Sequence, residues 1–364
     1  MLLAAAGVAP KALAAAPEPD LVRYLTARKR DARFEVAVLD EAGRDLLVVP
    51  LEARGHSFAI AGDGRRAIAF ARQPGRFAVA FDTTGAEAPT AFASQPDRHF
   101  FGHGAFADGD RLLFATENDY DGARGVAGVY DVAAGMRRIG EFATGGLDPH
   151  EAVLMPDGRT LCIANGGVLT HPDYGKLELN LDTMAPSLSY VDVTTGDIVE
   201  QVSVDPSLHQ LAFHHLAVDA YGAVWFGGQY HGPRGDRPPV VGRHRRGREP
   251  ELFSGSDDVL RDLGNYIGSV AVDSSGTTVA TSSPVGGNVA YWDAATGRCL
   301  GTTALRDVCG VAAGSAEPFR LTSGYGEMQE SGPGMPTDVL IDAPDEPTAW
   351  DNHLRRLPTE PASG

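Results

Sequence analysis

Short runs of alternating apolar and polar residues recur along the chain, and several of them end in an Asp that is followed closely by a Gly. Alternation of this kind indicates a strand that is buried on one face, because successive side chains point to opposite faces. Asp bonds to its own backbone and Gly accepts a positive φ, so each Asp–Gly phrase predicts a tight hairpin. Five such phrases end at Gly43, Gly85, Gly135, Gly196 and Gly297.

A second phrase is a small apolar stretch that runs into Asp-Gly or a similar turn, and four of its five copies begin with histidine. The copies begin at His56, His103, His150, His214-His215 and, without the histidine, Gly268. The first two intervals are both 47 residues, a period typical of propeller or solenoid arrays. A β-rich run lies between the two phrases, so each unit holds four strands, as a propeller blade does.

Counting the units predicts an all-β fold, a seven-bladed β-propeller over residues 17–364. Six inner strands begin near His56, His103, His150, His214, Gly268 and Asp307. The N-terminal runs near residues 24–49 supply three strands without an inner one, and Trp350–Leu357 supplies the missing inner strand. The ring would then be closed by pairing of the N- and C-terminal segments, which leaves no open edge. The pattern is poorest over Met328–Pro347, where we expect a loop. A β-sandwich is the alternative fold.

The amino-acid composition excludes some classes of binding partner. The chain of 364 residues has 44 Gly and 24 Pro, as many tight turns require, and a net charge of −17. Proteins that bind nucleic acids or anionic membranes need basic patches, so neither is expected as a partner of this acidic chain. We also expect the protein to be a monomer. The three cysteines, Cys162, Cys299 and Cys309, are too few and too separated for a disulfide framework.

The first sixteen residues are small and apolar, with Ala-rich cleavage patterns before Pro17. This composition is typical of the end of an export signal, so we expect residues 1–16 to be a signal remnant and the mature protein to be periplasmic. No charged segment precedes the apolar run, so an upstream twin-arginine segment is expected if the true start lies earlier. A disordered Ala-rich tail is the alternative, and the run is too short for membrane insertion as a helix.

Polar side chains gather on one predicted rim. In a propeller, the starts of inner strands and the ends of the next strands crowd one face around the axial channel. The opposite hairpins carry ordinary Asp, Thr and Gly turns. The candidate metal ligands on the histidine-bearing rim are His56, His103, His150, His214, His215, His231 and His353, and the candidate ligand-binding residues are Arg72, Asn118, Asn165, Gln229, Tyr230 and Asp307.

Converging histidines suit a transition metal, because neutral imidazole donates well to Zn, Fe, Cu, Ni and Mn. We expect iron or copper. Any one of these histidines has a structural alternative, a hydrogen bond to the backbone of the next blade. Glu117 and Glu151 also fall on this rim, where each is a candidate metal ligand, catalytic base or orienting partner for a ligand histidine.

One blade carries an insertion at residues 165–187 between its second and third strands. Loops longer than about 15 residues in compact domains tend to be functional or disordered. We expect this loop to cover the channel with His171 and Tyr174 facing inward. A loop that docks a partner is the competing interpretation.

Several phrases on this rim resemble a known family of exported bacterial proteins, catalogued as domain of unknown function 1513. The phrases include residues 102–104, 116–120, 146–151, 163–167, 213–216, 228–232, 307–310 and 350–353. The resemblance covers almost all of the chain after the signal. It implies a twin-arginine-exported, seven-bladed periplasmic propeller, often encoded beside imelysin-type iron-regulated proteins, and hence a part in iron acquisition. It implies no catalytic roles.

Three functions follow as hypotheses. The first is an exported propeller that binds a transition metal or small ligand at the His-rich channel mouth, with periplasmic iron-uptake proteins of imelysin type as partners. The second is a metal-dependent hydrolase or lyase acting on lactones or uronates, with Glu117 or Glu151 as base. The third is a protein-interaction scaffold, for which aromatic residues beside the histidines, such as Tyr174 and Tyr230, would form the contact surface.

Overall fold

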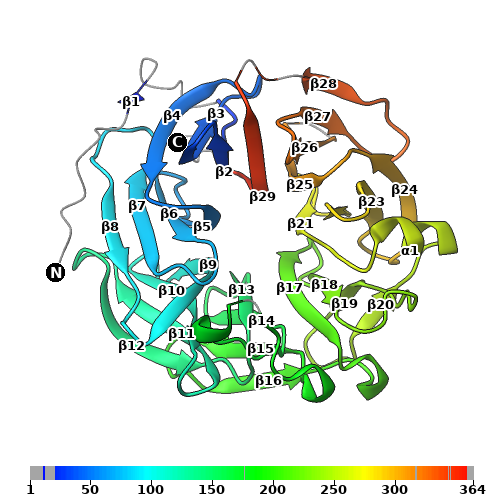
Figure 1. Ribbon diagram of the computed structural model, residues 1–364, viewed down its shortest axis with the longest axis horizontal. Helices are drawn as coiled ribbons and strands as arrows, with labels where there is room; N and C mark the ends of the chain where they lie inside the picture. The colour runs from blue at the N-terminus through cyan, green and yellow to red at the C-terminus, as the bar shows by residue number, and fades with distance from the viewer. Residues whose placement is uncertain are drawn as a thin grey trace.

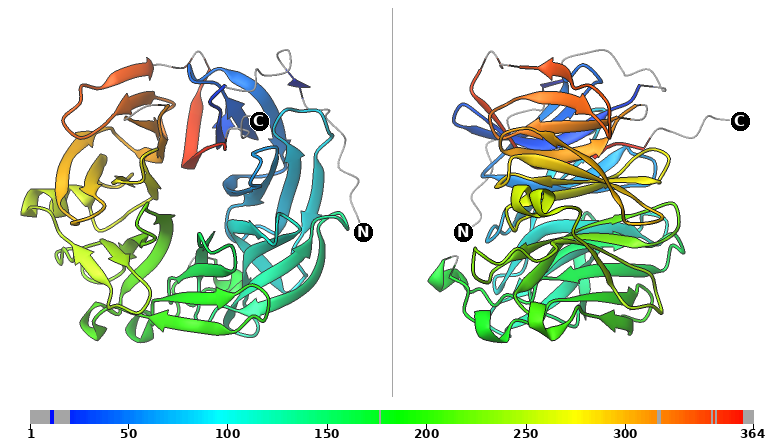
Figure 2. Two further views of the ribbon diagram at one scale, coloured as in Figure 1. Left: turned by 180° about the vertical axis from the view of Figure 1, so that it is seen from behind. Right: turned by 90° about the vertical axis from the view of Figure 1, so that its right-hand side faces the viewer.

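The computed structural model describes residues 11–12, 21–175, 177–315, 318–342, 344 and 346–358. The predicted export segment, residues 1–16, lies outside the described residues apart from the two-residue strand β1 (Lys11–Ala12). Seven antiparallel sheets surround a central axis, as the face views and the edge view show (Figures 1 and 2). The prediction of a seven-bladed β-propeller is confirmed.

Six blades are built from four consecutive strands that run from the axis outward. They are β5 (Gly55–Ile60), β6 (Arg66–Ala71), β7 (Phe77–Asp82) and β8 (Thr90–Ala93); β9 (Arg98–Ala107), β10 (Leu112–Asp119), β11 (Arg124–Asp131) and β12 (Arg137–Ala143); β13 (Pro149–Leu154), β14 (Thr160–Asn165), β15 (Ser187–Asp192) and β16 (Ile198–Val202); β17 (Leu211–Val218), β18 (Val224–Tyr230), β19 (Val241–His244) and β20 (Glu251–Phe253); β21 (Ser269–Val272), β22 (Thr278–Ser283), β23 (Asn288–Asp293) and β24 (Cys299–Ala304); β25 (Val308–Ala313), β26 (Phe319–Ser323), β27 (Met328–Ser331) and β28 (Asp338–Ile341).

The remaining blade joins the two ends of the chain. Its inner strand is β29 (Thr348–Arg356), which pairs with β2 (Tyr24–Arg30), and β3 (Arg33–Leu39) and β4 (Asp45–Leu51) follow outward. Figure 1 shows β29, in red, beside the dark blue β2. The predicted closure is therefore confirmed. The expectation of a loop over Met328–Pro347 is wrong, because β27 and β28 form two strands there and β27 pairs with β26.

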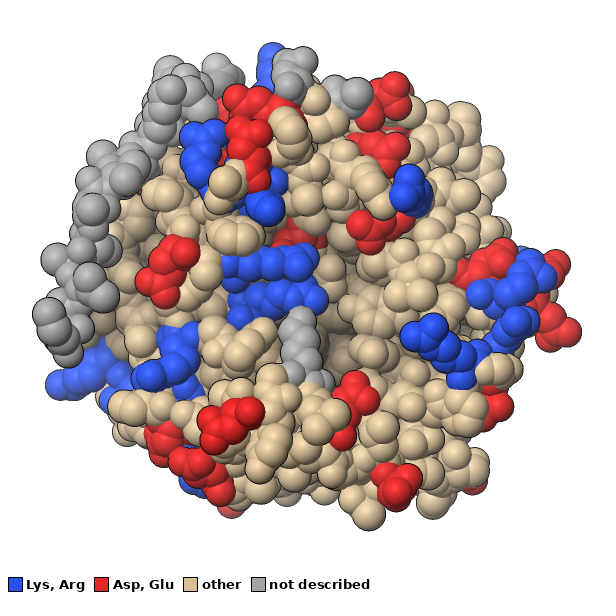
Figure 3. All heavy atoms as spheres, in the orientation of Figure 1, with Lys and Arg blue, Asp and Glu red and all other residues tan. Residues whose placement is uncertain are grey.

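Apolar side chains fill the spaces between neighbouring blades, as where Trp225 of β18 and Trp292 of β23 share one cluster. The helices are short: α1 (Asp257–Leu263) and the 3₁₀ turns η1 (Pro172–Tyr174), η2 (Leu181–Thr183) and η3 (Pro206–Leu208). No helix among the described residues is long and apolar enough to cross a membrane. The three cysteines are free, as expected. On the face drawn in Figure 3, basic side chains gather near the centre of the ring.

Candidate metal centre

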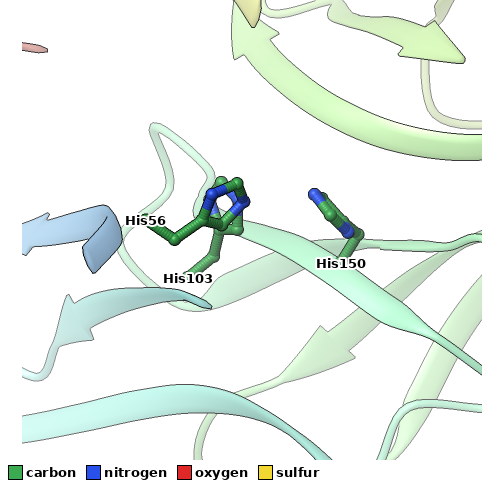
Figure 4. Close-up of side chains that lie close together, drawn as sticks. All are labelled: His56, His103 and His150. Atoms are coloured by element: carbon green, nitrogen blue, oxygen red, sulfur yellow. The ribbon is translucent and has the colours of Figure 1, made fainter. Parts of the chain in front are cut away.

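Six histidines from five blades meet in the channel. They are His56 of β5, His103 of β9, His150 of β13, His214 and His215 of β17, and His353 of β29. Their ring centroids lie 4.3 Å (His150–His214) to 6.0 Å (His214–His215) apart where they are neighbours. Figure 4 shows the rings of His56 and His103 side by side with the ring of His150 opposite. We call these six residues the histidine cluster.

Each of these histidines lies at an irregularity of its inner strand. In β5, His56 and Ser57 together oppose one residue of β6, and in β13 His150 and Glu151 oppose one residue of β14. The register also shifts at the other histidines: residues 101–103 and 351–353 each oppose one residue of the neighbouring strand, and His214 is a single extra residue in β17. β21, where the phrase lacks histidine, pairs with β22 without a shift. A bulge re-aims side chains that a regular strand would send to opposite faces, so consecutive residues such as His214 and His215 both reach the channel.

Two glycines make room for this convergence. Gly102 has a φ of +102°, and a Cβ there would lie 2.5 Å from a ring carbon of His56. At Gly166 a Cβ would lie 2.2 Å from Oδ2 of Asp148, the carboxylate that faces Nε2 of His214 at 3.4 Å. Larger residues at either position would push a cluster histidine out of place.

The nitrogens of the cluster form three overlapping triads. The triads are His56–His103–His150, His103–His215–His353 and His150–His214–His215, and within each triad the ligand atoms lie within 4.8 Å of one another. Each pair of triads shares one histidine. If each imidazole offers one nitrogen to one ion, no two triads can be complete together, so the geometry favours one bound ion per chain.

Carboxylates face the Nδ1 atoms of three rings. Glu151 lies between His103 and His215, with its oxygens 3.6 and 3.5 Å from their Nδ1 atoms. Asp351 lies 3.7 Å from Nδ1 of His56. Carboxylates in such positions orient metal-binding histidines and leave Nε2 for the ion. Arg355 in turn donates to Glu151, and Leu216 donates its backbone N–H to the same carboxylate.

Burial keeps five of the six rings neutral. It lowers the pKa of His56 to about 3 and that of His215 to about 4, against the opposing effects of Asp351 and Glu151. Burial likewise lowers the pKa values of His103, His150 and His353. Neutral imidazole is the form that binds a metal.

Several buried nitrogens of these rings lack a hydrogen-bond partner among the described residues: Nδ1 of His56, Nε2 of His103, Nε2 of His150, Nδ1 of His215 and both nitrogens of His353. An unsatisfied buried polar group costs about 1–3 kcal/mol. A structural role for these histidines would have paired such atoms with neighbouring backbone, as the alternative interpretation supposed. Nδ1 of His56 and of His215 face carboxylates at 3.7 and 3.5 Å, and a metal ion would satisfy Nε2 of His103, His150 and His353.

A cavity of about 310 Å³ opens onto the cluster. Its wall includes His56, His150 and His214 but not His103, His215 or His353. The cluster therefore has three rings at the cavity and three fully buried rings behind them. An ion held by His56, His103 and His150 would keep an open coordination position toward the cavity, the arrangement of catalytic and transport sites rather than of closed structural ones.

Glu117 does not join the cluster. Its buried carboxylate accepts hydrogen bonds from Tyr130 at 2.6 Å and from Arg138 at 2.9 Å, on the outer strands of its own blade. Burial raises the pKa of Glu117, while Arg138 opposes that rise. Nothing among these contacts connects Glu117 to the channel, so the structure gives no support to its predicted part as a base.

We expect Glu117→Ala to reduce the free energy of unfolding by about 3–5 kcal/mol, because the change leaves Arg138 and Tyr130 buried without their partner. Urea unfolding would measure this loss. Metal content should stay the same as in the wild-type protein. A stable variant with impaired metal binding would instead return Glu117 to the site.

The other predicted residues divide between the cavity and other places. Arg72, Gln229 and His231 line the cavity. Asn118 forms hydrogen bonds with His99 and Thr170, and Asn165 forms them with Thr144, Ser187 and Ser189. Tyr230 forms a hydrogen bond with Asp236. Asp307 lines a separate hollow with Arg306. His231 stands apart from the six rings, and its Nδ1 lies 2.9 Å from Glu178.

The insertion between β14 and β15 does border the cavity, through Val168, Thr170 and Glu178. The expectation that His171 and Tyr174 face inward is wrong. His171 contacts Asp121 and the ring of Tyr120, and Tyr174 is 62% exposed. The 3₁₀ turn η1 carries its tyrosine outward because Pro172 directs the chain into a turn on the surface.

Sequence reasoning missed several residues of the site: Asp148, Glu178, Tyr266, Asp351 and Asn352. Two of them had a signal. Asp148 and Asp351 each stand two positions before a cluster histidine, and residues two apart in a strand share a face. Each carboxylate lies beside a histidine of another blade, and the sequence alone does not show which two residues meet.

A family model described as "Protein of unknown function (DUF1513)" matches residues 49–357. The chain belongs to this family. The expected family is therefore confirmed over most of the propeller, including all six cluster histidines. A search of curated proteins found no match.

Solved structures that resemble this DUF1513 chain share its fold at low identity. Hydrazine synthase of Kuenenia stuttgartiensis aligns with a TM-score of 0.59 and 12% identity, over 84% of this chain and 91% of that one. The β-propeller domain of Cps50 (Swd1) from Myceliophteria thermophila gives 0.58 and 11%, over 82% and 93%. A chain of a mitotic checkpoint complex gives 0.57 and 13%, over 79% of each. These similarities show the propeller fold alone.

Proposed function

We propose that this protein binds one transition-metal ion, iron or copper, at the histidine cluster. The observation that carries the proposal is the set of six imidazoles whose ligand atoms form three overlapping triads, with buried nitrogens on five of the rings that have no hydrogen-bond partner among the described residues. Imidazole suits copper, zinc, iron and nickel, and among divalent ions copper binds such sites most tightly. Ring rotation within each triad would bring the nitrogens to the spacing set by metal–nitrogen bonds of about 2.1 Å.

Elemental analysis tests this proposal directly. The protein would be purified without chelators and without a polyhistidine tag, then dialysed, and its content of iron, copper, zinc and nickel measured. We expect about one ion per chain, either as purified or after reloading of the chelator-stripped protein with Fe²⁺ or Cu²⁺. Protein that is metal-free as purified and binds none of the added ions would refute the proposal.

We further propose that this site serves metal acquisition in the bacterial periplasm, with imelysin-type proteins as partners. The signal-like composition of residues 1–16 supports the location, and the resemblance implies the neighbouring genes. Cell fractionation of the protein expressed with its native upstream region would test the compartment. Capture of periplasmic proteins with and without EDTA would test whether a partner docks at the metal.

One observation favours an enzyme as a second candidate. His231 lines the cavity, Glu178 faces its Nδ1 at 2.9 Å, and its Nε2 has no hydrogen-bond partner among the described residues. A carboxylate-oriented imidazole can accept a proton from a metal-bound water or a substrate. Turnover of lactones, phosphoesters or oligouronates by the metal-loaded protein, abolished in His231→Gln, would support this candidate.

A further inference from the structure

The cavity beside the cluster is lined by three cluster histidines and by other polar side chains. Those other polar side chains include Arg72, Gln229, Asn352, His231, Asp148 and Glu178. At about 310 Å³ the cavity lies at the small end of ligand pockets, which span about 300–1,000 Å³. Its chemistry therefore points to a small polar ligand.

The carboxylates in this wall are already engaged by histidines. Asp148 faces Nε2 of His214 at 3.4 Å, and Glu178 faces Nδ1 of His231 at 2.9 Å. Asp351, just behind the wall, accepts a hydrogen bond from Arg54 and faces His56. Acidic groups here thus have basic neighbours, and they are poor candidates for binding a second cation.

Arg72 differs from these carboxylates because its guanidinium is only partly engaged. Among the described residues its guanidinium makes one long contact, from Nη1 to Oδ1 of Asp351 at 3.4 Å, and Arg54 makes the closer approach to that carboxylate. Its side chain is 30% exposed, so it reaches the cavity while its stem stays covered. The other N–H groups of its fork remain available to a ligand.

A metal held by neutral imidazoles keeps its full positive charge. With Arg72 nearby, the cavity then combines two positive centres and several neutral donors with the carboxylates of Asp148 and Glu178, which face His214 and His231. A planar guanidinium binds carboxylate or phosphate through paired hydrogen bonds, and an open metal position accepts an oxygen of the same group. Asn352, whose Nδ2 donates to Tyr266 at 3.3 Å, adds a further donor at the wall.

We infer that this cavity binds a small oxyanion, a carboxylate or a phosphate, between the cluster-bound metal and Arg72. The inference rests on the proposed metal site and names the class of ligand that this site takes. The anion completes the coordination shell of the metal and neutralises Arg72. An ion at His56–His103–His150 or at His150–His214–His215 can meet it, because each of these triads includes two rings of the cavity wall, whereas His103–His215–His353 includes none.

Malonate and inorganic phosphate serve as probes on the protein loaded with Cu²⁺. Calorimetry would measure binding, and the visible absorption band of the copper would report an oxygen on the metal. We expect one of the two anions to bind and to shift the band, malonate indicating a carboxylate ligand and phosphate indicating a phosphate ligand. Metal content is measured after each titration, so that removal of the ion by the anion is recognised.

Arg72→Gln tests the guanidinium. We expect anion affinity to fall at least tenfold while one copper per chain is retained. Arg54→Gln is the matched control, because Arg54 also contacts Asp351 but does not line the cavity, and its anion affinity should change less than twofold. Urea midpoints of both variants check that the fold is intact.

The outcomes separate this inference from the proposed function. Full copper loading with no response to either anion, or equal affinity in Arg72→Gln, would overturn the oxyanion site and leave the metal site standing. Failure to load either copper or iron, together with anion binding that Arg72→Gln abolishes, would refute the metal proposal and retain an anion site at Arg72. If the protein binds no metal and neither anion, the metal proposal and the oxyanion inference are both refuted.

Discussion

Acid will destabilise the metal-free protein as the pH falls from about 6.5 to 4. Burial holds the pKa of His56 at about 3 and that of His215 at about 4 in the folded chain, whereas both titrate near 6.5 when unfolded. In this window the unfolded state binds more protons than the folded state, so the free energy of unfolding decreases on acidification. At pH 5 each of these two histidines costs about 2 kcal/mol, a large share of an ordinary stability of about 5–15 kcal/mol.

Urea unfolding of the chelator-treated protein at pH 7.5, 6 and 5 would measure this slope. The double variant His56→Gln/His215→Gln should have a flatter profile, since glutamine does not titrate. His209→Gln is the control, because His209 lies outside the cluster, where its Nδ1 contacts Pro206 of the loop before β17. A free energy of unfolding that stays constant from pH 7.5 to 5 would contradict the prediction. Bound metal should raise the stability at each pH by mass action, about 2.7 kcal/mol at 100 times its Kd.

Most of the fold could be predicted from the sequence because a propeller repeats its local signals. The Asp–Gly hairpin phrases mark the outer strands, and the blade count and the role of Trp350–Leu357 follow from the one unit that lacks an inner strand. The blade at β25–β28 was harder to predict. β28 (Asp338–Ile341) is largely exposed, so its alternation is weak, and only pairing with β27 gives it a strand conformation.

Six of the seven predicted histidines meet in the cluster, and Glu151, a predicted orienting partner, lies beside two of them, whereas the carboxylates Asp148 and Asp351 were missed. The repeat places His56, His103 and His150 at equivalent points, and symmetry then brings them together. The direction in which each ring points depends on the bulges. The bulges form where backbone pairing gives way to contacts across the channel, and no short sequence phrase predicts them. Glu117 was grouped with the rim by its position at the end of β10, yet its side chain points to Arg138. The position of a residue along its strand predicts whether it lies at the rim, whereas its charged partners determine where its side chain points.

The double variant His103→Leu/His150→Leu will lose the bound metal. Each of the three triads contains His103 or His150, so no complete triad remains, and metal content should fall from about one ion to less than a tenth of an ion per chain. The metal-free variant should be at least as stable as the metal-free wild-type protein. The change removes two buried Nε2 atoms that lack partners, and apolar residues of similar volume often replace buried polar groups without cost.

His244→Leu is the contrasting control. His244 is buried outside the cluster, with Nδ1 2.7 Å from the hydroxyl of Tyr190 and Nε2 2.8 Å from the carbonyl oxygen of Arg248. This histidine is structural, so its replacement should lower stability by about 1–3 kcal/mol, the cost of unpaired buried partners, and leave metal content unchanged. Elemental analysis and urea unfolding of both proteins give the two readouts. If the double variant instead loses stability as His244→Leu does and keeps its metal, the cluster histidines are structural and the ion lies elsewhere.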